Sequence, residues 1–348
     1  MLTTIQAKKT HYEQMYLHSA QRQQCIDFIQ HEISNPTTTT SLLSTQAYAS
    51  SFMTQSIAVI QRMMKIYRRS PSYNFSRIIQ SAIIAVLLGI MFDNRTPKTE
   101  GDMTSRVNSI YIAVVFIMTT SFDNVLPLFE TERNLFYKHQ ANAAYHPFTF
   151  INALLFSEIP YIVFTTIVFC TFFYISLGFD ADVEKMFFFY LFFGLNMALW
   201  TIMGQAFISL FRKLSSAQGY GGVLVSMANL LAGVIIRPQN IHRNLKFFYW
   251  LIPSHYVVEG ILTSQFDGNE TAIKTKSGSP FYDELGCGDD DEVDYCFGTV
   301  DQWMRFTFGG YFLKENIWIN ILYLVIVCTL SRIVIYIALV YLNHSRNK

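Results

Sequence analysis

Long apolar runs separated by polar stretches constrain this sequence more than any other feature. A hydrocarbon core of about 30 Å needs about 20 residues of helix, and each run meets or nearly meets that length. Charged residues make up 15% of the chain, against about 25% in an average soluble domain. The pattern predicts an all-α membrane protein with six transmembrane helices. The predicted spans are 75–92, 107–129, 148–179, 186–211, 219–236 and 317–342.

The segment before the first span divides into two parts. Residues 1–48 are polar and include a threonine-rich run, which predicts a largely disordered cytoplasmic linker with one short helix near 12–30. From 49 to 69, apolar side chains recur at helical spacing among arginines and a lysine. This pattern predicts an amphipathic connecting helix on an anionic membrane surface, although a surface helix of a soluble domain would also show it. The predicted transmembrane domain is therefore 49–348.

A large polar segment, 237–316, separates the last two spans. Within it, Leu245 to Phe266 is half apolar and aromatic but is interrupted by Pro253, so it is too broken to cross a bilayer. The sequence predicts a re-entrant or interfacial helix pair here, packed against the bundle inside a large outer loop.

Basic residues in the short loops predict the orientation. Arginines and lysines precede the first span, follow the second and the fourth, and end the chain, whereas the other short loops offset their bases with acids. The positive-inside rule then places both termini in the cytoplasm and 237–316 outside. Arg332, in the inner part of the sixth span, fits this orientation because its side chain would extend toward cytoplasmic headgroups. We expect a multi-pass protein, with the plasma membrane as its location.

The outer loop carries two features of an oxidising compartment. Cys287 and Cys296 flank an acidic run, and a disulfide between them is expected there, the alternative being two free thiols. Acceptor tripeptides for N-glycosylation begin at Asn269 and, close to the membrane, at Asn94. The acidic run 289–292 lacks the spacing of a calcium loop, so it is interpreted as solvated surface and no metal site is predicted.

Short motifs then follow one another in a specific order along the chain. They read YRRSPSY before the first span, ETERNLFYKHQANAAY after the second, SEIPY in the third, GVII at the end of the fifth, and WLIP with a later QF beyond it. Over residues 48–347 this order resembles the membrane domain of G-subfamily ABC transporters, in particular the C-terminal half of the pleiotropic drug resistance type. Lys138-His139 departs from the arginine and glutamate of the family's motif.

The resemblance implies that the stretch 132–144 is a cytoplasmic coupling helix that docks on a nucleotide-binding domain. The residues it assigns to this contact are Glu132, Arg133, Phe136, Tyr137 and Lys138, with Arg212 and Lys213 in the next cytoplasmic loop. A plain connector whose bases reach the headgroups is the alternative. Because acids at a membrane boundary usually have a basic partner, we expect Glu132 and Glu158 to pair with Arg133 or Arg77.

The resemblance also implies that the second and fifth spans, together with those of a second six-helix unit, line a central cavity. Aromatic and methionine side chains there would suit varied lipophilic substrates. Ordinary packing between helices is the alternative for each residue. The candidates are Ser109, Phe116, Thr119, Thr120 and Asn124 on the second span, and Val225, Met227, Asn229 and Leu230 on the fifth.

The sequence lacks a phosphate-binding loop of the form G-x-x-x-x-G-K-[ST]. We therefore expect no catalytic residues and no cofactor in this chain, with ATP and magnesium bound by a nucleotide-binding domain on its N-terminal side. The expected function is the translocating part of an ATP-driven exporter of lipophilic compounds, drugs or lipids. Its partners would be that domain, a second six-helix unit and membrane lipid. Nucleic acid is not expected, because the net charge is +1.

Other functional classes fit the residues less well. A membrane-embedded enzyme would need polar groups clustered at one depth, but the histidines are scattered over different loops. A secondary carrier or a channel subunit usually shows charges in the middle of its spans or inverted repeats, which are not evident here. A non-functional transporter fragment also stays open.

Overall fold

The computed structural model describes residues 15, 19–34, 48, 50–91, 97–179, 182–287 and 295–342. The chain divides into two compact units, 1–49 and 50–348. The first unit contains helix α2, Ala20–Ser34, which overlaps the short helix predicted near 12–30. The prediction of disorder for the rest of 1–48 falls almost entirely outside the described residues.

Five helices within the described part of the chain are long and apolar enough to cross a membrane. They correspond to the first, second, third, fourth and sixth predicted spans. They are α4 (Pro71–Met91), α5 (Glu100–Ala141), α6 (Pro147–Leu177), α7 (Val183–Leu210) and α13 (Ile317–Tyr341). The structure thus confirms a long apolar helix at five of the six predicted spans.

The predicted fifth span, 219–236, differs from the structure. Helix α8 begins at Leu214 and ends at Leu230, and the chain then continues in turns and bends to Ile236. Its 17 residues fall short of the roughly 20 that cross a bilayer in a straight helix. The predicted span begins five residues after the start of α8, because the prediction followed apolar residues and the first turn of α8, Leu214 to Gln218, is mostly polar.

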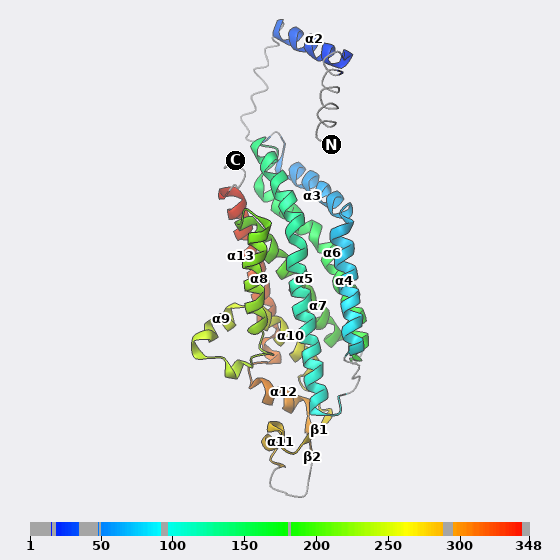
Figure 1. Cartoon of the computed structure of the whole chain (residues 1–348), viewed down its shortest axis with the longest axis vertical. Coiled ribbons are helices and arrows are strands. Elements are labelled where there is room, and N and C mark those ends of the chain that lie inside the picture. Colours follow the sequence, from blue (N-terminus) through cyan, green and yellow to red (C-terminus); the bar gives the residue numbers. More distant parts are fainter. Residues whose placement is uncertain are drawn as a thin grey trace, which may run out of the picture. The chain divides into compact units, whose positions relative to one another are not determined.

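Helix α7 forms the centre of the bundle. It packs against α5, α6 and α13, and Figure 1 shows α5 between α4 and α8, with α7 alongside. Phe189, Phe192, Phe193 and Trp200 of α7 are fully buried. A helix that is apolar on every side is typical of such a surrounded position.

Glycines let helices approach each other closely at two positions. A Cβ atom at Gly204 of α7 would lie 2.8 Å from the carbonyl oxygen of Phe122 in α5. A Cβ at Gly221 of α8 would overlap the Phe122 ring. These contacts fix α5 between α7 and α8, as small residues do at interfaces between membrane helices.

Helix α3 (Phe52–Arg68) lies at one end of the bundle, which we call the α3 end. The side chain of Ser51 accepts a hydrogen bond from the Thr54 amide and so caps its first turn. Its buried face consists of Gln55, Val59, Met63 and Tyr67, at spacings of four residues. The helix predicted over 49–69 is therefore present and packs against α6.

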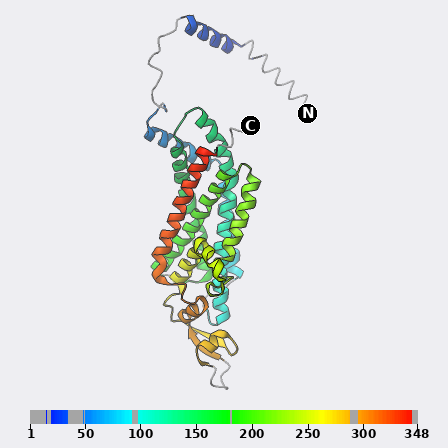
Figure 2. The same cartoon turned by 90° about the vertical axis from the view of Figure 1, so that its left-hand side faces the viewer.

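The opposite end, the sheet end, contains the predicted outer loop in folded form (Figure 2). Strands β1 (Ala272–Lys276) and β2 (Tyr295–Thr299) pair antiparallel, with Ala272 opposite Thr299. Short helices complete this end, and their bounds are η1 Pro238–Asn240, η2 Arg243–Leu245, α9 Lys246–Leu251, α10 Ser254–Phe266, α11 Pro280–Glu284, α12 Val300–Phe308 and η4 Lys314–Asn316. Two helices, α9 and α10, meet at Pro253 as predicted, and all 13 residues of α10 are buried. Whether this pair enters the membrane stays a prediction.

Candidate functional site

A polar cluster lies inside the bundle where α3, α4, α6 and α7 meet. The Glu158 carboxylate on α6 accepts hydrogen bonds from the Tyr67 hydroxyl at 2.7 Å, the Tyr73 hydroxyl at 3.1 Å and the Gln205 amide at 3.3 Å. The Arg77 guanidinium forms an ion pair with the same carboxylate at 3.4 Å. We call these five residues the Glu158 cluster.

The cluster is almost fully shielded, since Glu158 is 1% exposed and Arg77 is 3% exposed. Arg77 also donates to the Thr201 hydroxyl at 3.1 Å. A buried ion pair recovers its desolvation cost only when further hydrogen bonds satisfy both charges. These contacts satisfy Glu158 and both terminal nitrogens of Arg77, while the Arg77 Nε has no partner in the described part of the chain. The pairing of Glu158 with Arg77 that the sequence predicts is confirmed.

Tyr67 joins helix α3 to this cluster. Burial raises the pKa of its hydroxyl well above the usual 10.0, so it remains a hydrogen-bond donor to Glu158. Its ring packs edge-on against Tyr73, with ring centres 5.7 Å apart. Tyr67 therefore links α3 to both α4 and α6.

The predicted coupling helix is not a separate element. Helix α5 runs without interruption from Glu100 to Ala141, so the stretch from Glu132 onward forms its last turns. Pro127 is accommodated inside this helix, and neither glycine nor proline follows it before Ala141. A coupling helix over 132–144 that is separate from the second span is therefore not present, because nothing in that stretch breaks α5 before Ala141.

Arg133 points into the bundle rather than toward a partner. Its guanidinium donates to the backbone carbonyls of Ile208, Phe211 and Arg212, the last two at 2.7 and 3.1 Å. These carbonyls lie at the C-terminus of α7, where backbone acceptors have no partner within the helix. Arg133 thus ties the end of α5 to the turn between α7 and α8.

The predicted pairing of Glu132 with Arg133 is wrong. Glu132 pairs instead with Arg62 of α3, at 3.5 Å, because Arg133 is occupied by the carbonyls of α7. The Nδ1 atom of His139 lies 3.1 Å from the Tyr145 hydroxyl and 3.4 Å from Arg62. Burial raises the pKa of Tyr145 to about 12, so its hydroxyl stays protonated.

The coupling residues therefore separate into two groups. Glu132, Arg133, Phe136 and Tyr137 are buried within this unit, which contradicts the expectation that they are presented on the surface. Lys138, Arg212 and Lys213 are exposed at the α3 end. Contact of any of them with a nucleotide-binding domain stays a prediction.

The cavity candidates lie on α5 and α8, which are neighbours in Figure 1. Helix α5 leaves one stripe uncovered along its length, through Thr104, Asn108, Ile112, Asp123 and Thr131, with half-buried Phe116 and Thr119 between. Helix α8 buries only Ala217, Gly221, Val225 and Ala228. We call the uncovered stripe of α5 and the uncovered side of α8 the α5–α8 face.

Seven of the nine predicted cavity residues are half-buried or exposed, and two are buried. Phe116, Thr119, Thr120, Asn124 and Asn229 are half-buried, and Met227 and Leu230 are exposed. Ser109 and Val225 are buried against this unit, so the structure contradicts a cavity-lining position for both. Helical spacing turns them inward, and the Ser109 hydroxyl is satisfied by the Ser105 carbonyl at 2.9 Å.

At the sheet end, Cys287 and Cys296 form a disulfide. Asn269 is half-buried in a turn, and its side-chain oxygen accepts a hydrogen bond from the Thr271 amide at 2.9 Å. Asn94 and the acidic run 289–292 lie outside the described residues. No group of three or more histidine, cysteine or acidic residues that could hold a metal occurs among the residues that the structure describes.

Several contributors to these sites were not identified from sequence. Gln205 and Thr201 lie in the apolar fourth span, Arg62 lies in the helix predicted on the membrane surface, and Tyr145 ends the motif that follows the second span. The polar residues inside the fourth span were a usable signal, because such residues in membrane helices usually face the interior of the bundle.

Comparison with known proteins identifies the family of this chain. The family model described as ABC-2 type transporter matches residues 54–266. ABC transporter G family member 36 of Arabidopsis thaliana is 28% identical over 218 residues, which are 62% of this chain and 15% of that protein. ABC transporter G family member 32 of Oryza sativa subsp. japonica is 30% identical over 268 residues, 76% of this chain and 18% of that protein.

A third relative extends the match along the chain. ABC transporter G family member 31 of Arabidopsis thaliana is 25% identical over 304 residues, covering 87% of this chain and 20% of that protein. The chain therefore spans a fifth or less of the length of these relatives. It belongs to the ABC-2 type transporter family, as a membrane domain similar to those of G-family ABC transporters.

Proposed function

We propose that this chain is the substrate-translocating part of an ATP-driven exporter of lipophilic compounds, drugs or lipids, of the pleiotropic drug resistance type. The observation that carries the proposal is the α5–α8 face. Its uncovered residues include Asn108 and Asp123, within the predicted span 107–129, and Thr131 just beyond that span. Polar side chains within a span are costly against lipid tails, so Asn108 and Asp123 require protein or a water-filled cavity beside them.

Helix α13 provides the contrast within the same unit. Its uncovered side presents large apolar residues, among them Trp318, Leu322, Ile326, Leu330 and Ile337. Such a surface suits lipid contact. The two surfaces differ in the way expected if α13 faces lipid and α5 faces a cavity shared with a second unit of the same kind.

The α3 end supplies the surface for a motor. Lys138 ends the exposed stripe of α5, and Arg212 and Lys213 begin the turn before α8. Arg133 links these two stretches through the carbonyls of Ile208 and Phe211. A nucleotide-binding domain that binds ATP and magnesium would thus act on both stretches at once.

The orientation follows from charge and redox chemistry. Exposed bases, including Lys65, Arg68 and Lys138, occupy the α3 end, which favours the cytoplasmic side. The disulfide lies at the sheet end, which favours an oxidising exterior. We propose both termini in the cytoplasm of a plasma-membrane protein, with Asn269 as a glycosylation site outside.

The experiment is ATP hydrolysis by the chain assembled with its nucleotide-binding domain in liposomes, with lipophilic compounds screened for stimulation. Thr119→Trp on the α5–α8 face is expected to lose most of the stimulation by compound. Val325→Trp places the same ring on the uncovered side of α13 and should behave as wild type. Full stimulation of the Thr119→Trp assembly would contradict a cavity at this face.

A further inference from the structure

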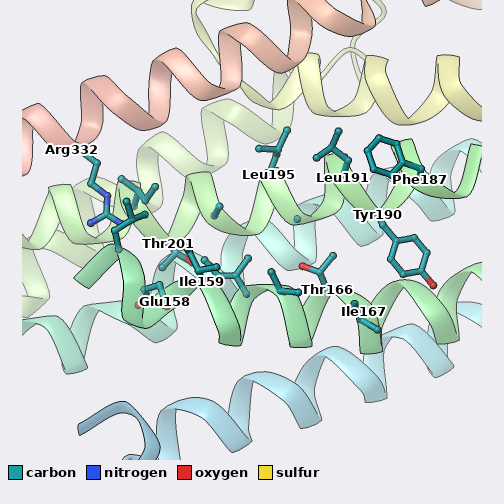
Figure 3. Close-up of a pocket in the computed structure, with 16 residues that line it drawn as sticks. Glu158, Ile159, Thr166, Ile167, Phe187, Tyr190, Leu191, Leu195, Thr201 and Arg332 are labelled. Carbon is teal, nitrogen blue, oxygen red and sulfur yellow. The ribbon is translucent and has the colours of Figure 1, made fainter. Parts of the chain in front are cut away.

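A cavity of about 370 Å³ lies between α6 and α7 (Figure 3). It is on the opposite side of α7 from the α5–α8 face. Asn196 of α7 donates a hydrogen bond to the Val114 carbonyl of α5 at 3.1 Å, whereas Gly194, Ala198 and Thr201 line the cavity. At 3.6 residues per turn, Asn196 lies about 140–160° around the helix from each of these three residues. The cavity is thus separated from the proposed translocation path by α7 itself.

The cavity has the character of a slot for a hydrocarbon chain. On α6 its lining extends from Leu155 to Ile167, a rise of about 18 Å, against about 15 Å for half a bilayer core. Figure 3 shows Arg332, Glu158 and Thr201 at one end of it and Phe187 and Tyr190 at the other. The stretch between the two ends is lined almost wholly by aliphatic side chains.

A second cavity of about 430 Å³ adjoins the polar end of the first. Leu155 and Arg332 line both cavities, so the two meet at the Arg332 side chain. The second cavity adds the polar side chains of Asn152, Thr329 and Tyr336. It lies toward the N-terminal end of α6, where a lipid headgroup would be placed.

The charges at the junction do not balance. Glu158 is one anion, and Arg77 is the cation within ion-pairing distance of it among the described residues. Arg332 adds a second cation beside the first cavity. Its Nη1 donates to the Ile151 carbonyl at 3.4 Å, while Nε and Nη2 are shielded from solvent and have no hydrogen-bond partner in the described part of the chain. A net positive charge inside a bilayer is costly unless an anion accompanies it.

We propose that the two cavities form one binding site for an anionic phospholipid. Its phosphate pairs with Arg332, because a planar guanidinium matches phosphate oxygens in geometry and charge. Its headgroup occupies the cavity beside Asn152 and Tyr336, and one acyl chain lies between α6 and α7. The lipid is a resident ligand whose phosphate neutralises Arg332, and its binding requires only that α6, α7 and α13 lie in a bilayer.

The test is native mass spectrometry of the full chain in mild detergent, with phosphatidylserine or phosphatidylcholine added. We expect wild type to retain phosphatidylserine preferentially, and Arg332→Gln to retain it about tenfold less. Arg332→Lys keeps the charge and should keep the preference. Ala198→Phe fills the chain slot and should reduce retention of both lipids.

Matched controls are Arg305→Gln, which removes an exposed charge at the sheet end, and Val325→Phe, which adds a ring on the uncovered side of α13. Both should retain phosphatidylserine as wild type does. The proposal would be overturned if wild type retained phosphatidylserine and phosphatidylcholine equally. It would also be overturned if Ala198→Phe and Val325→Phe retained phosphatidylserine equally. Neither outcome depends on whether Arg332→Gln folds. Since the readout is lipid retention, a failure of transport by the chain would leave this result unaffected.

Discussion

The Tyr67 hydroxyl of α3 donates a 2.7 Å hydrogen bond to Glu158 of α6, a residue 91 positions later in the chain. Helix α3 also forms the Arg62–Glu132 ion pair with the end of α5. One amphipathic helix therefore contacts both the buried polar cluster and the end of the helix that lines the proposed cavity. In the proposed function, α3 would link a motor bound at the α3 end to the inside of the bundle.

Replacing Glu158 with Gln should destabilise the bundle strongly. Arg77 would then be a buried cation without its carboxylate, which typically costs about 3–5 kcal/mol. Arg77→Gln should cost a similar amount, and the double variant should cost less than the sum. Thermal unfolding of the four proteins in detergent checks this cycle, and strictly additive losses would show that the two side chains do not act as a pair.

Replacing Arg133 with Met should loosen the turn between α7 and α8. The carbonyls of Ile208, Phe211 and Arg212 would lose a charged donor, worth about 1.5–3 kcal/mol for such a contact. Hydrogen exchange measured by mass spectrometry should become faster near 205–214. Lys138→Met removes an exposed charge from the same helix and serves as the control, and identical exchange in both variants would argue against the link.

Two neighbouring glycines of α8 should respond differently to alanine. A Cβ at Gly221 would overlap the Phe122 ring, whereas a Cβ at Gly222 would have no atom within 4 Å. Gly221→Ala should therefore lower the thermal midpoint, and Gly222→Ala should leave it equal or slightly raise it, because alanine favours the helix. A midpoint that falls equally in both variants would mean that α8 does not pack on α5 as described.

The sequence predicted those features that depend on local pattern. Runs of apolar residues marked five helices correctly, and helical spacing marked α3. The Glu158–Arg77 ion pair was also predictable from the sequence, because a buried carboxylate needs a basic partner and Arg77 lies near the same membrane boundary. The disulfide was expected because two cysteines share one polar loop.

The errors arose where tertiary contacts decide the outcome. Arg133 looked like a surface base, but the carbonyls that it binds belong to a helix end 75 or more residues away. Ser109 and Val225 have the right character for a cavity, but only the packing of α5 on its neighbours decides which side faces inward. The start of α8 was missed because a polar first turn carries no hydropathy signal.

Stability should depend on pH through Glu259 of α10. Burial raises the pKa of this carboxyl to about 7, although the Asn316 side chain and the Leu313 amide donate to it. In the unfolded state the Glu259 carboxyl has its usual pKa of 4.5, so the folded state keeps this proton up to a higher pH. Stability therefore falls as the pH rises from 4.5 to about 7 and stays lower above pH 7.

Glu259→Gln should remove this dependence. Between pH 5 and pH 8, wild type should lose about 2 kcal/mol more stability than the variant, seen as a larger drop in the thermal midpoint. Glu315→Gln, at an exposed position beside Asn316, is the matched control and should follow wild type. The same pH profile for wild type and Glu259→Gln would contradict the assignment.

The central claim is that the α3 end and the sheet end lie on opposite sides of a membrane. Single cysteines at Lys65 and Lys276, both exposed, test it in intact cells that express a variant without the free thiols of Cys25, Cys170 and Cys328. A membrane-impermeant maleimide should label Lys276→Cys in intact cells and Lys65→Cys only after the cells are permeabilised. Labelling of both positions from the outside would contradict the account.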